Sequence, residues 1–195
     1  LELPALLAAA AETFVDLLPD AKASNEQLLG FVYERLTGYL REQGYQAAEV
    51  DAVAASRPPW AEIPVRLEAV RAFAGLPEAP ALAAANKRIG NILKKAEAEA
   101  AVEAQVSEQL LHEPAEKALF AAMQQTVPQA DAQFLTGDYT AALQTLAALR
   151  APVDAFFDAV MVNAEQAELR RNRQGLLKKL HEAMNRVADL ARLSA

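Results

Sequence analysis

The chain has 195 residues, a formal net charge of -7, 53% hydrophobic residues and 23% charged residues. This length suggests one domain with room for an appendage, and the balance is typical of a folded protein rather than a disordered one. The 45 Ala and 27 Leu far outnumber the 3 Ile and 13 Val. Because Ala and Leu favour helices and β-branched residues favour strands, the composition argues against an all-β fold and predicts an all-α one.

The composition also limits the chemistry. The chain has no cysteine, which excludes disulfides, thiolate metal sites and cysteine nucleophiles. No uncharged apolar run approaches the length of a membrane span, so no membrane partner is expected. The first residues, Leu1 to Pro4, lack both an initiator Met and a secretory signal pattern and look like a cut inside a longer chain. The absence of cysteine fits the reducing cytoplasm, where we expect the protein to be.

The first half of the chain has helical periodicity that is interrupted at Pro and Gly. Ser24 and Gln27 have the spacing of a capping box at the start of a long helix, and Gly44 is expected just after its end. An acidic helix or helical linker is expected at 96–107. The predicted helices are 3–18, 24–43, 47–55, 64–74 and 80–96.

The second half of the chain also has helical periodicity that is interrupted at Pro and Gly. Pro128 is expected to interrupt a helix that begins at Pro114, and the helix beginning at Pro152 is apolar around most of its circumference, so it should be central in a helical bundle. The predicted helices are 114–126, 129–136, 139–149, 152–165 and 166–193. In this division residues 1–22 are a remnant helix or linker, and 23–195 form one all-helical domain with a core at about 113–195.

A search for catalytic groupings finds no Gly-rich phosphate loop, no H-E-x-x-H motif and no nucleophile elbow. His112 and His181 lie far apart in sequence and are expected on the surface. Glu97, Glu99 and Glu103 are expected to form a solvated face. No metal site is predicted, and this chain alone is expected to be non-catalytic.

Charge placement is more informative. The segment 86–95 carries four cations and no acid. At about 100° per residue, its polar side chains fall within an arc of about 120° opposite Ile89, Ile92 and Leu93. Asn86 lies at the edge of the apolar side, where its amide could hydrogen-bond a neighbouring helix. The basic face is either a phosphate-binding surface or a solvated face with cations near a helix C-terminus.

The segment 168–179 favours the first interpretation, because it has five cations and one acid. Each segment has a net charge of +4, and removing both from the total of -7 leaves -15 on the rest of the chain. Two basic patches on an acidic background are typical of a selective polyanion site. The candidate RNA-binding residues are Lys87, Arg88, Asn91, Lys94, Lys95, Arg170, Arg171 and Lys178.

Arg173 falls inside the apolar stripe of its segment and therefore needs a partner, because an unpaired buried charge is very costly. Asp154 and Asp158 share one face of the preceding predicted helix. We expect one of them to form a structural ion pair with Arg173; the competing interpretation leaves Arg173 free for RNA.

Four strings resemble a known family: Leu28–Leu36, Ala84–Leu93, Pro152–Val162 and Leu169–Arg173. In this order they are similar to the C-terminal part of the bacterial glycyl-tRNA synthetase β subunit. The last two strings also resemble the helical anticodon-binding domain of arginyl-tRNA synthetases. One departure is the Gln174-Gly175 pair after Arg173, where family members often carry Leu and a small residue.

The resemblance implies a helical-bundle module that recognises the anticodon arm of glycine tRNA. It also implies an α₂β₂ ligase in which the α subunit uses ATP and Mg²⁺ to attach glycine to tRNA. This chain would need no cofactor, and its partners would be glycine tRNA, the α subunit and the rest of the β subunit. The alternative is a helical protein-interaction or scaffold module that supports subunit assembly without direct RNA contact.

Overall fold

The computed structural model describes every residue except 1–2, 15, 18–19, 21–22 and 195. The described residues form helices and no strand, which confirms the all-α prediction. Short 3-10 helices lie at Trp60–Glu62 (η1), Glu108–Leu110 (η2) and Leu190–Leu193 (η3). The α-helices are α1 (Leu3–Thr13), α2 (Ser24–Glu42), α3 (Ala47–Ala55), α4 (Ile63–Ala74), α5 (Ala79–Glu97), α6 (Pro114–Leu135), α7 (Tyr139–Ala147), α8 (Arg150–Ala159) and α9 (Ala167–Met184).

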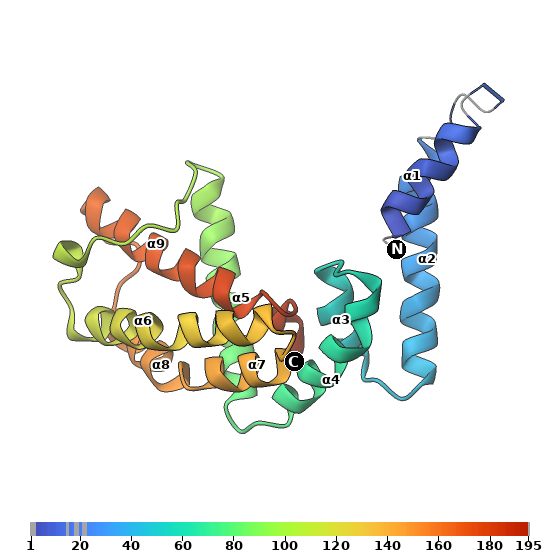
Figure 1. Cartoon of the computed structure of the whole chain (residues 1–195). Coiled ribbons are helices and arrows are strands. Elements are labelled where there is room, and N and C mark those ends of the chain that lie inside the picture. Colours follow the sequence, from blue (N-terminus) through green and yellow to red (C-terminus); the bar gives the residue numbers. More distant parts are fainter. Residues whose placement is uncertain (1–2, 15, 18–19, 21–22, 195) are drawn as a thin grey trace.

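Helices α5 to α9 form a bundle at one end of the molecule, and α3 and α4 join it to an outlying pair, α1 and α2 (Figure 1). Within the bundle α6 packs against α7, α8 and α9, and α5 packs against α8, α9 and η3. Leu119, Leu143, Phe156 and Leu177 are fully buried at the centre. Burial of these apolar side chains is the main force that holds the helices together.

The outlying pair has almost no core. Within α1 only Ala11 is buried, and within α2 only Leu29. Leu6, Phe31 and Tyr39 are each more than half exposed. These helices are therefore stabilised mainly by each other and by contact of α2 with α3.

Helix boundaries are set by local hydrogen bonds, and some differ from the prediction. Ser24 does not cap α2: Ala23 is the N-cap, and the Ser24 hydroxyl donates to the carbonyl of Asp20. Gly44 does follow α2 with a φ of 90°, as predicted for a residue that must turn the chain. The first helix ends at Thr13, and part of the predicted segment to residue 18 lies outside the described residues.

A segment predicted as helical instead crosses α9 as an extended strap. Residues 101–107 have no helix, and the Asn172 side chain binds both backbone groups of Ser107, accepting from its N–H at 2.7 Å and donating to its carbonyl at 3.1 Å. A Cβ at Gly175 would lie only 2.1 Å from the carbonyl oxygen of Gln105. The strap therefore needs a glycine beneath it.

Helix α6 also departs from the prediction, because it continues through Pro128 to Leu135. A proline inside a helix removes one backbone hydrogen bond and costs about 3 kcal/mol. Met123 and Ala130, on either side of it, are buried. Packing of α6 against three neighbouring helices offsets the local cost.

Two predicted helices are shorter than expected. Helix α8 ends at Ala159, and the following residues alternate between buried Val160 and Val162 and exposed Met161 and Asn163, as in an extended chain. Helix α9 ends at Met184 rather than near residue 193. Apolar residues after a helix end were therefore misread as its continuation.

The predicted partner of Arg173 was wrong. Its Nε donates to Oε1 of Glu116 at 2.6 Å, and its Nη1 donates to the carbonyl of Met161 at 2.9 Å. Asp154 instead lies 3.4 Å from Arg150 on its own helix, and nothing joins Arg173 to Asp158 in the described chain. Because α8 stops early, a backbone carbonyl and not a second carboxylate completes the site.

Glu116 also closes the start of α6. Its Oε2 accepts from the backbone N–H groups of His112 and Glu113, at 2.9 and 2.8 Å. Burial alone would raise the pKa of this carboxyl, but Arg173 and these backbone N–H groups stabilise the charged form more, and the pKa is lowered. Glu116 is therefore a buried carboxylate that joins α6 to α9.

We expect replacement of Arg173 by Met to destabilise the protein by about 3–5 kcal/mol, because it leaves the Glu116 carboxylate buried and unpaired. Asp154→Asn is the matched control, since it removes an exposed pair that contributes about 1 kcal/mol or less. Urea unfolding measures both. Equal losses from the two variants would contradict the assigned role of the buried pair.

The lowered pKa of Glu116 also predicts a pH dependence. Its contribution to stability is complete above the ordinary pKa of 4.5 and is lost as the pH falls from 4.5 through the lowered folded-state pKa. Urea unfolding between about pH 6 and pH 3 should give a steeper loss for the natural chain than for Glu116→Gln, which has no proton to bind. Parallel curves would show that Glu116 does not contribute.

Replacement of Gly175 by Ala should displace the strap from α9, because the nearest atoms to the new Cβ belong to backbone. We expect faster hydrogen exchange and faster proteolysis within 98–107. Gly30→Ala is the control, since its new Cβ meets nothing within 4 Å. That control should stabilise its helix by about 1 kcal/mol; an unchanged strap in Gly175→Ala would refute the close approach.

Candidate nucleic-acid interface

The outer face of α5 carries the first basic cluster. Lys87, Arg88, Asn91, Lys94 and Lys95 are all exposed, whereas Asn86, Ile89 and Leu93 on the inner face are buried. None of these four cations forms an ion pair within the part of the chain that the structure describes. Their charge is therefore available to a ligand.

A groove of about 790 Å³ follows this face and has α9 on its other side. Four cations and one carboxylate, Glu99, line it, so its potential is positive. The groove thus brings Arg170, from the basic segment 168–179, close to the basic cluster of α5. Its lining residues are Ala84, Lys87, Arg88, Asn91, Ile92, Lys95, Ala96, Glu99, Asn163, Arg170, Gln174 and Ser194.

The remaining candidates lie differently. Arg171 is exposed and lines an adjoining groove of about 950 Å³ between α9 and the strap, which shares Arg170 and Gln174 with the first groove. Lys94 lines neither of the two grooves. The two grooves form one continuous surface that runs from α5 across the start of α9.

Lys178 is already occupied. Its Nζ donates to Oε1 of Glu97 at 2.6 Å, and this hydrogen bond raises the pKa of the Lys178 ammonium. Lys178 is outside both grooves. Arg170 is partly occupied, since its Nη1 donates to the carbonyl of Ala164 at 2.9 Å while its side chain lines the groove. The eight predicted residues therefore differ in their availability.

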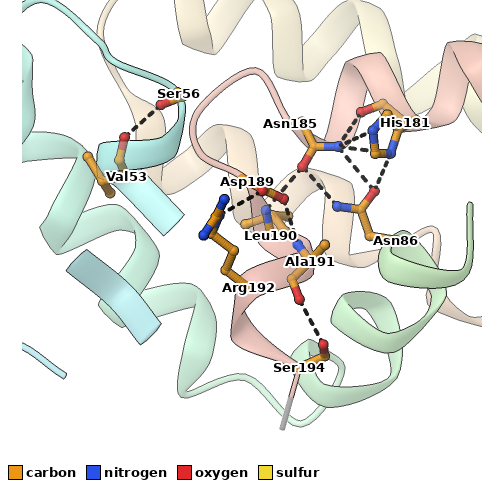
Figure 2. Close-up of polar contacts among 10 residues, drawn as sticks. All are labelled: Val53, Ser56, Asn86, His181, Asn185, Asp189, Leu190, Ala191, Arg192 and Ser194. Carbon is orange, nitrogen blue, oxygen red and sulfur yellow. Dashed lines mark hydrogen bonds and ion pairs between the residues drawn. The ribbon is translucent and has the colours of Figure 1, made fainter. Parts of the chain in front are cut away.

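A buried polar network fixes the orientation of α5 beneath its basic face (Figure 2). Nδ2 of Asn86 donates to Oδ1 of Asn185 at 2.8 Å, and Oδ1 of Asn86 lies 2.9 Å from Nδ1 of His181. Asn185 also donates to the carbonyl of His181 and accepts from the N–H of Leu190. The expected contact of Asn86 with a neighbouring helix is confirmed.

His181 is therefore not the surface residue that was predicted. It is half-buried, and burial lowers the pKa of its imidazole below the ordinary value of 6.5. At neutral pH the ring is uncharged and acts as a hydrogen-bonding part of the network. Its role is structural, because it lies behind the basic face.

Two groove residues, Asn163 and Gln174, were not predicted from the sequence, and neither was Phe157, which contacts the groove residue Arg88. Phe157 packs against Arg88, whose Cζ lies 4.1 Å from the ring centroid. Asn163 lies in the extended segment that was mistaken for helix, so its position could not be inferred from helical spacing. Gln174 was noted only as a family departure. Their shared location depends on tertiary packing and has no signal in the sequence.

The grooves hold no recognisable metal centre, since the described residues contain no group of three His, Cys, Asp or Glu side chains that could bind an ion. Among those residues, no helix has the length and apolarity needed to cross a membrane. The groove between α5 and α9 is lined by the cations Lys87, Arg88, Lys95 and Arg170 and by the amides of Asn91, Asn163 and Gln174. This combination binds phosphates and hydrogen-bonds bases.

Comparison with known proteins agrees with this chemistry. Residues 82–194 match the DALR anticodon binding domain, a range that includes both basic segments. The glycine–tRNA ligase beta subunits of Polaromonas naphthalenivorans (strain CJ2) and Acidovorax sp. (strain JS42) are each 66% identical over the whole chain, which covers 27% and 26% of their lengths. That of Dechloromonas aromatica (strain RCB) is 62% identical, with 27% of its length covered.

The chain thus spans about a quarter of the length of these curated relatives. The resemblance to glycyl-tRNA synthetase β subunits is confirmed. More than half of the chain matches the domain family, and the match contains most of α5 and all of α6 to α9. The chain therefore belongs to the family of DALR anticodon-binding domains.

Proposed function

We propose that this chain is the tRNA-binding module of a glycyl-tRNA synthetase β subunit and that it binds the anticodon arm of glycine tRNA. Membership of an anticodon-binding family supports a tRNA ligand, and the relatives named above support glycine tRNA. The observation that carries the proposal is the groove between α5 and α9. It gathers cations from two distant segments, and those of α5 form no ion pair with any described residue.

In this proposal the groove cations bind the phosphates of the anticodon stem and loop. Lys87, Arg88, Asn91, Lys95 and Arg170 contact the RNA first, because they line the same groove. Arg171 extends the contact along the adjoining groove, and Lys94, which lines neither groove, adds positive charge on the exposed side of α5. Lys178 contributes only when it leaves Glu97. The acidic remainder of the chain repels RNA from other faces.

The same proposal assigns a supporting role to the chain in the whole enzyme. An α₂β₂ ligase attaches glycine to tRNA in the cytoplasm, and its α subunit supplies the ATP and Mg²⁺ chemistry. This chain has no cofactor and no catalytic step of its own. By binding the anticodon arm it fixes the tRNA so that the acceptor end reaches the α subunit.

A scaffold role is the second candidate, and the exposed apolar residues of the outlying helices favour it. Leu6, Leu28, Phe31 and Tyr39 of α1 and α2 are between 44% and 57% exposed. Such a surface is typical of a contact with another protein. It lies outside the matched range 82–194, so the two roles use different parts of the chain.

Reversal of two groove charges tests the RNA-binding role. We expect Lys87→Glu with Lys95→Glu to weaken binding of glycine tRNA by the intact enzyme on the order of tenfold or more and to reduce the slope of log K against log salt by about 2. The physical reason is the loss of two phosphate contacts. Filter binding over a salt series measures both quantities, and circular dichroism checks that the protein is folded.

The matched control is Lys117→Glu with Lys179→Glu. These exposed side chains change the net charge by the same amount but line neither of the two grooves. The control should keep most of the affinity and the natural salt slope. If the groove reversal leaves tRNA binding unchanged, the RNA-binding assignment is wrong and the scaffold role becomes the better one.

A further inference from the structure

We propose that the guanidinium of Arg88, stacked on Phe157, is a platform for one unpaired nucleobase, and that groove amides bind the edge of that base. The proposal rests on the RNA-binding function argued above. It adds a second kind of ligand to the groove: an unstacked base in addition to the backbone phosphates. The amides belong to Asn91, Asn163 and Gln174.

Phe157 holds Arg88 in place. The Cζ of Arg88 lies 4.1 Å from the Phe157 ring centroid, which places the guanidinium over the ring. Phe157 packs edge to face against the fully buried Phe156, with centroids 5.6 Å apart and ring planes at 80°. Arg88 also lines the groove. In this proposal Phe157 covers one face of the guanidinium and the base stacks on the opposite face.

Two other arginines that lie over aromatic rings, Arg66 and Arg186, are committed to the fold. Arg66 lies over Tyr139 but also donates to Glu62 and to two backbone carbonyls, and Arg186 lies over Phe134 but pairs with Asp131. Arg88 forms no such ion pair or hydrogen bond within the described chain. Single-stranded RNA bases are often stacked on guanidinium planes. Arg88 suits this role because Phe157 holds its side chain while its N–H groups bind no described residue.

The side-chain amides of Asn86, Asn172, Asn91, Asn163 and Gln174 also fall into two groups: those that bind other parts of the protein and those that have no partner among the described residues. Asn86 and Asn172 are buried and use their side chains to bind other parts of the protein. Asn91, Asn163 and Gln174 line the groove and make no side-chain hydrogen bond to any described residue. An amide offers a donor beside an acceptor, which matches the edge of a nucleobase.

The surroundings of the platform also suit an RNA loop. The groove volume of about 790 Å³ accommodates a base together with adjoining backbone. Lys87, Lys95 and Arg170 line the same space and would hold the phosphates on either side of the base. A bound loop would therefore place charge on the lysines and a flat ring on Arg88.

Replacement of Arg88 by Lys tests the platform, because it keeps the charge and removes the plane. In the intact enzyme we expect affinity for glycine tRNA to fall on the order of tenfold, as for loss of one stacked base, with no change in salt slope. Phe157→Leu should have a similar effect. Filter binding is repeated with tRNA transcripts in which each anticodon-loop nucleotide in turn is abasic. One abasic position should weaken the natural enzyme and have no further effect in Arg88→Lys.

Arg150→Lys is the control, since it makes the same substitution on an exposed arginine that lines neither groove. It should bind every transcript as the natural enzyme does. Natural affinity in Arg88→Lys, or an abasic penalty that persists in it at every position, overturns the platform. If Lys87→Glu with Lys95→Glu still weakens binding, the RNA-binding function survives that result; if neither variant has an effect, both proposals fail.

Discussion

The pairing of Glu116 with Arg173 is the constraint on which the arrangement of the bundle depends. One carboxylate closes the first turn of α6 through two backbone N–H groups and binds the guanidinium of α9. That guanidinium also binds the carbonyl of Met161, so the connection between α8 and α9 is fixed at the same point. With Arg173 directed inward, the neighbouring positions Arg170 and Gln174 line the groove. The internal ion pair and the buried apolar residues of α9 together orient the side of this helix that faces the groove.

Arginines serve two purposes in this molecule: the two that are buried among the described residues have internal partners, and some of the exposed ones have no ion pair there. Buried Arg66 and Arg173 bind carboxylates and backbone carbonyls, whereas exposed Arg88 and Arg171 make no ion pair within the described chain. Burying an unpaired charge is costly, so inward cations must have internal partners. An exposed cation needs none and can bind a ligand. Lys87, Arg88 and Lys95 belong to this second group and line the same groove.

Sequence patterns predicted the helical class, most helix starts and the basic face of α5, because each of these depends on neighbours within a few residues. They did not predict the partner of Arg173, since Glu116 lies 57 positions away. Hydrophobic spacing also failed after Ala159, where buried Val160 and Val162 follow an extended alternation. Asn163 lines the groove, and Phe157 contacts Arg88, only through tertiary packing. The division at residues 22 and 23 and the RNA contacts stay predictions.

The strap over Gly175 has a consequence for the order in which the chain assembles. Gln105 lies against Gly175, which is 70 positions further along the chain. The strap therefore has nothing to pack against until α9 has formed and docked. Contacts between such distant positions require the closure of a long loop and form late in folding. The groove between α9 and the strap, which Arg171 lines, is completed when the strap docks. The ability to bind a ligand in this groove would therefore appear only in chains that have finished folding. Ligand binding there would distinguish fully folded molecules from partly folded ones.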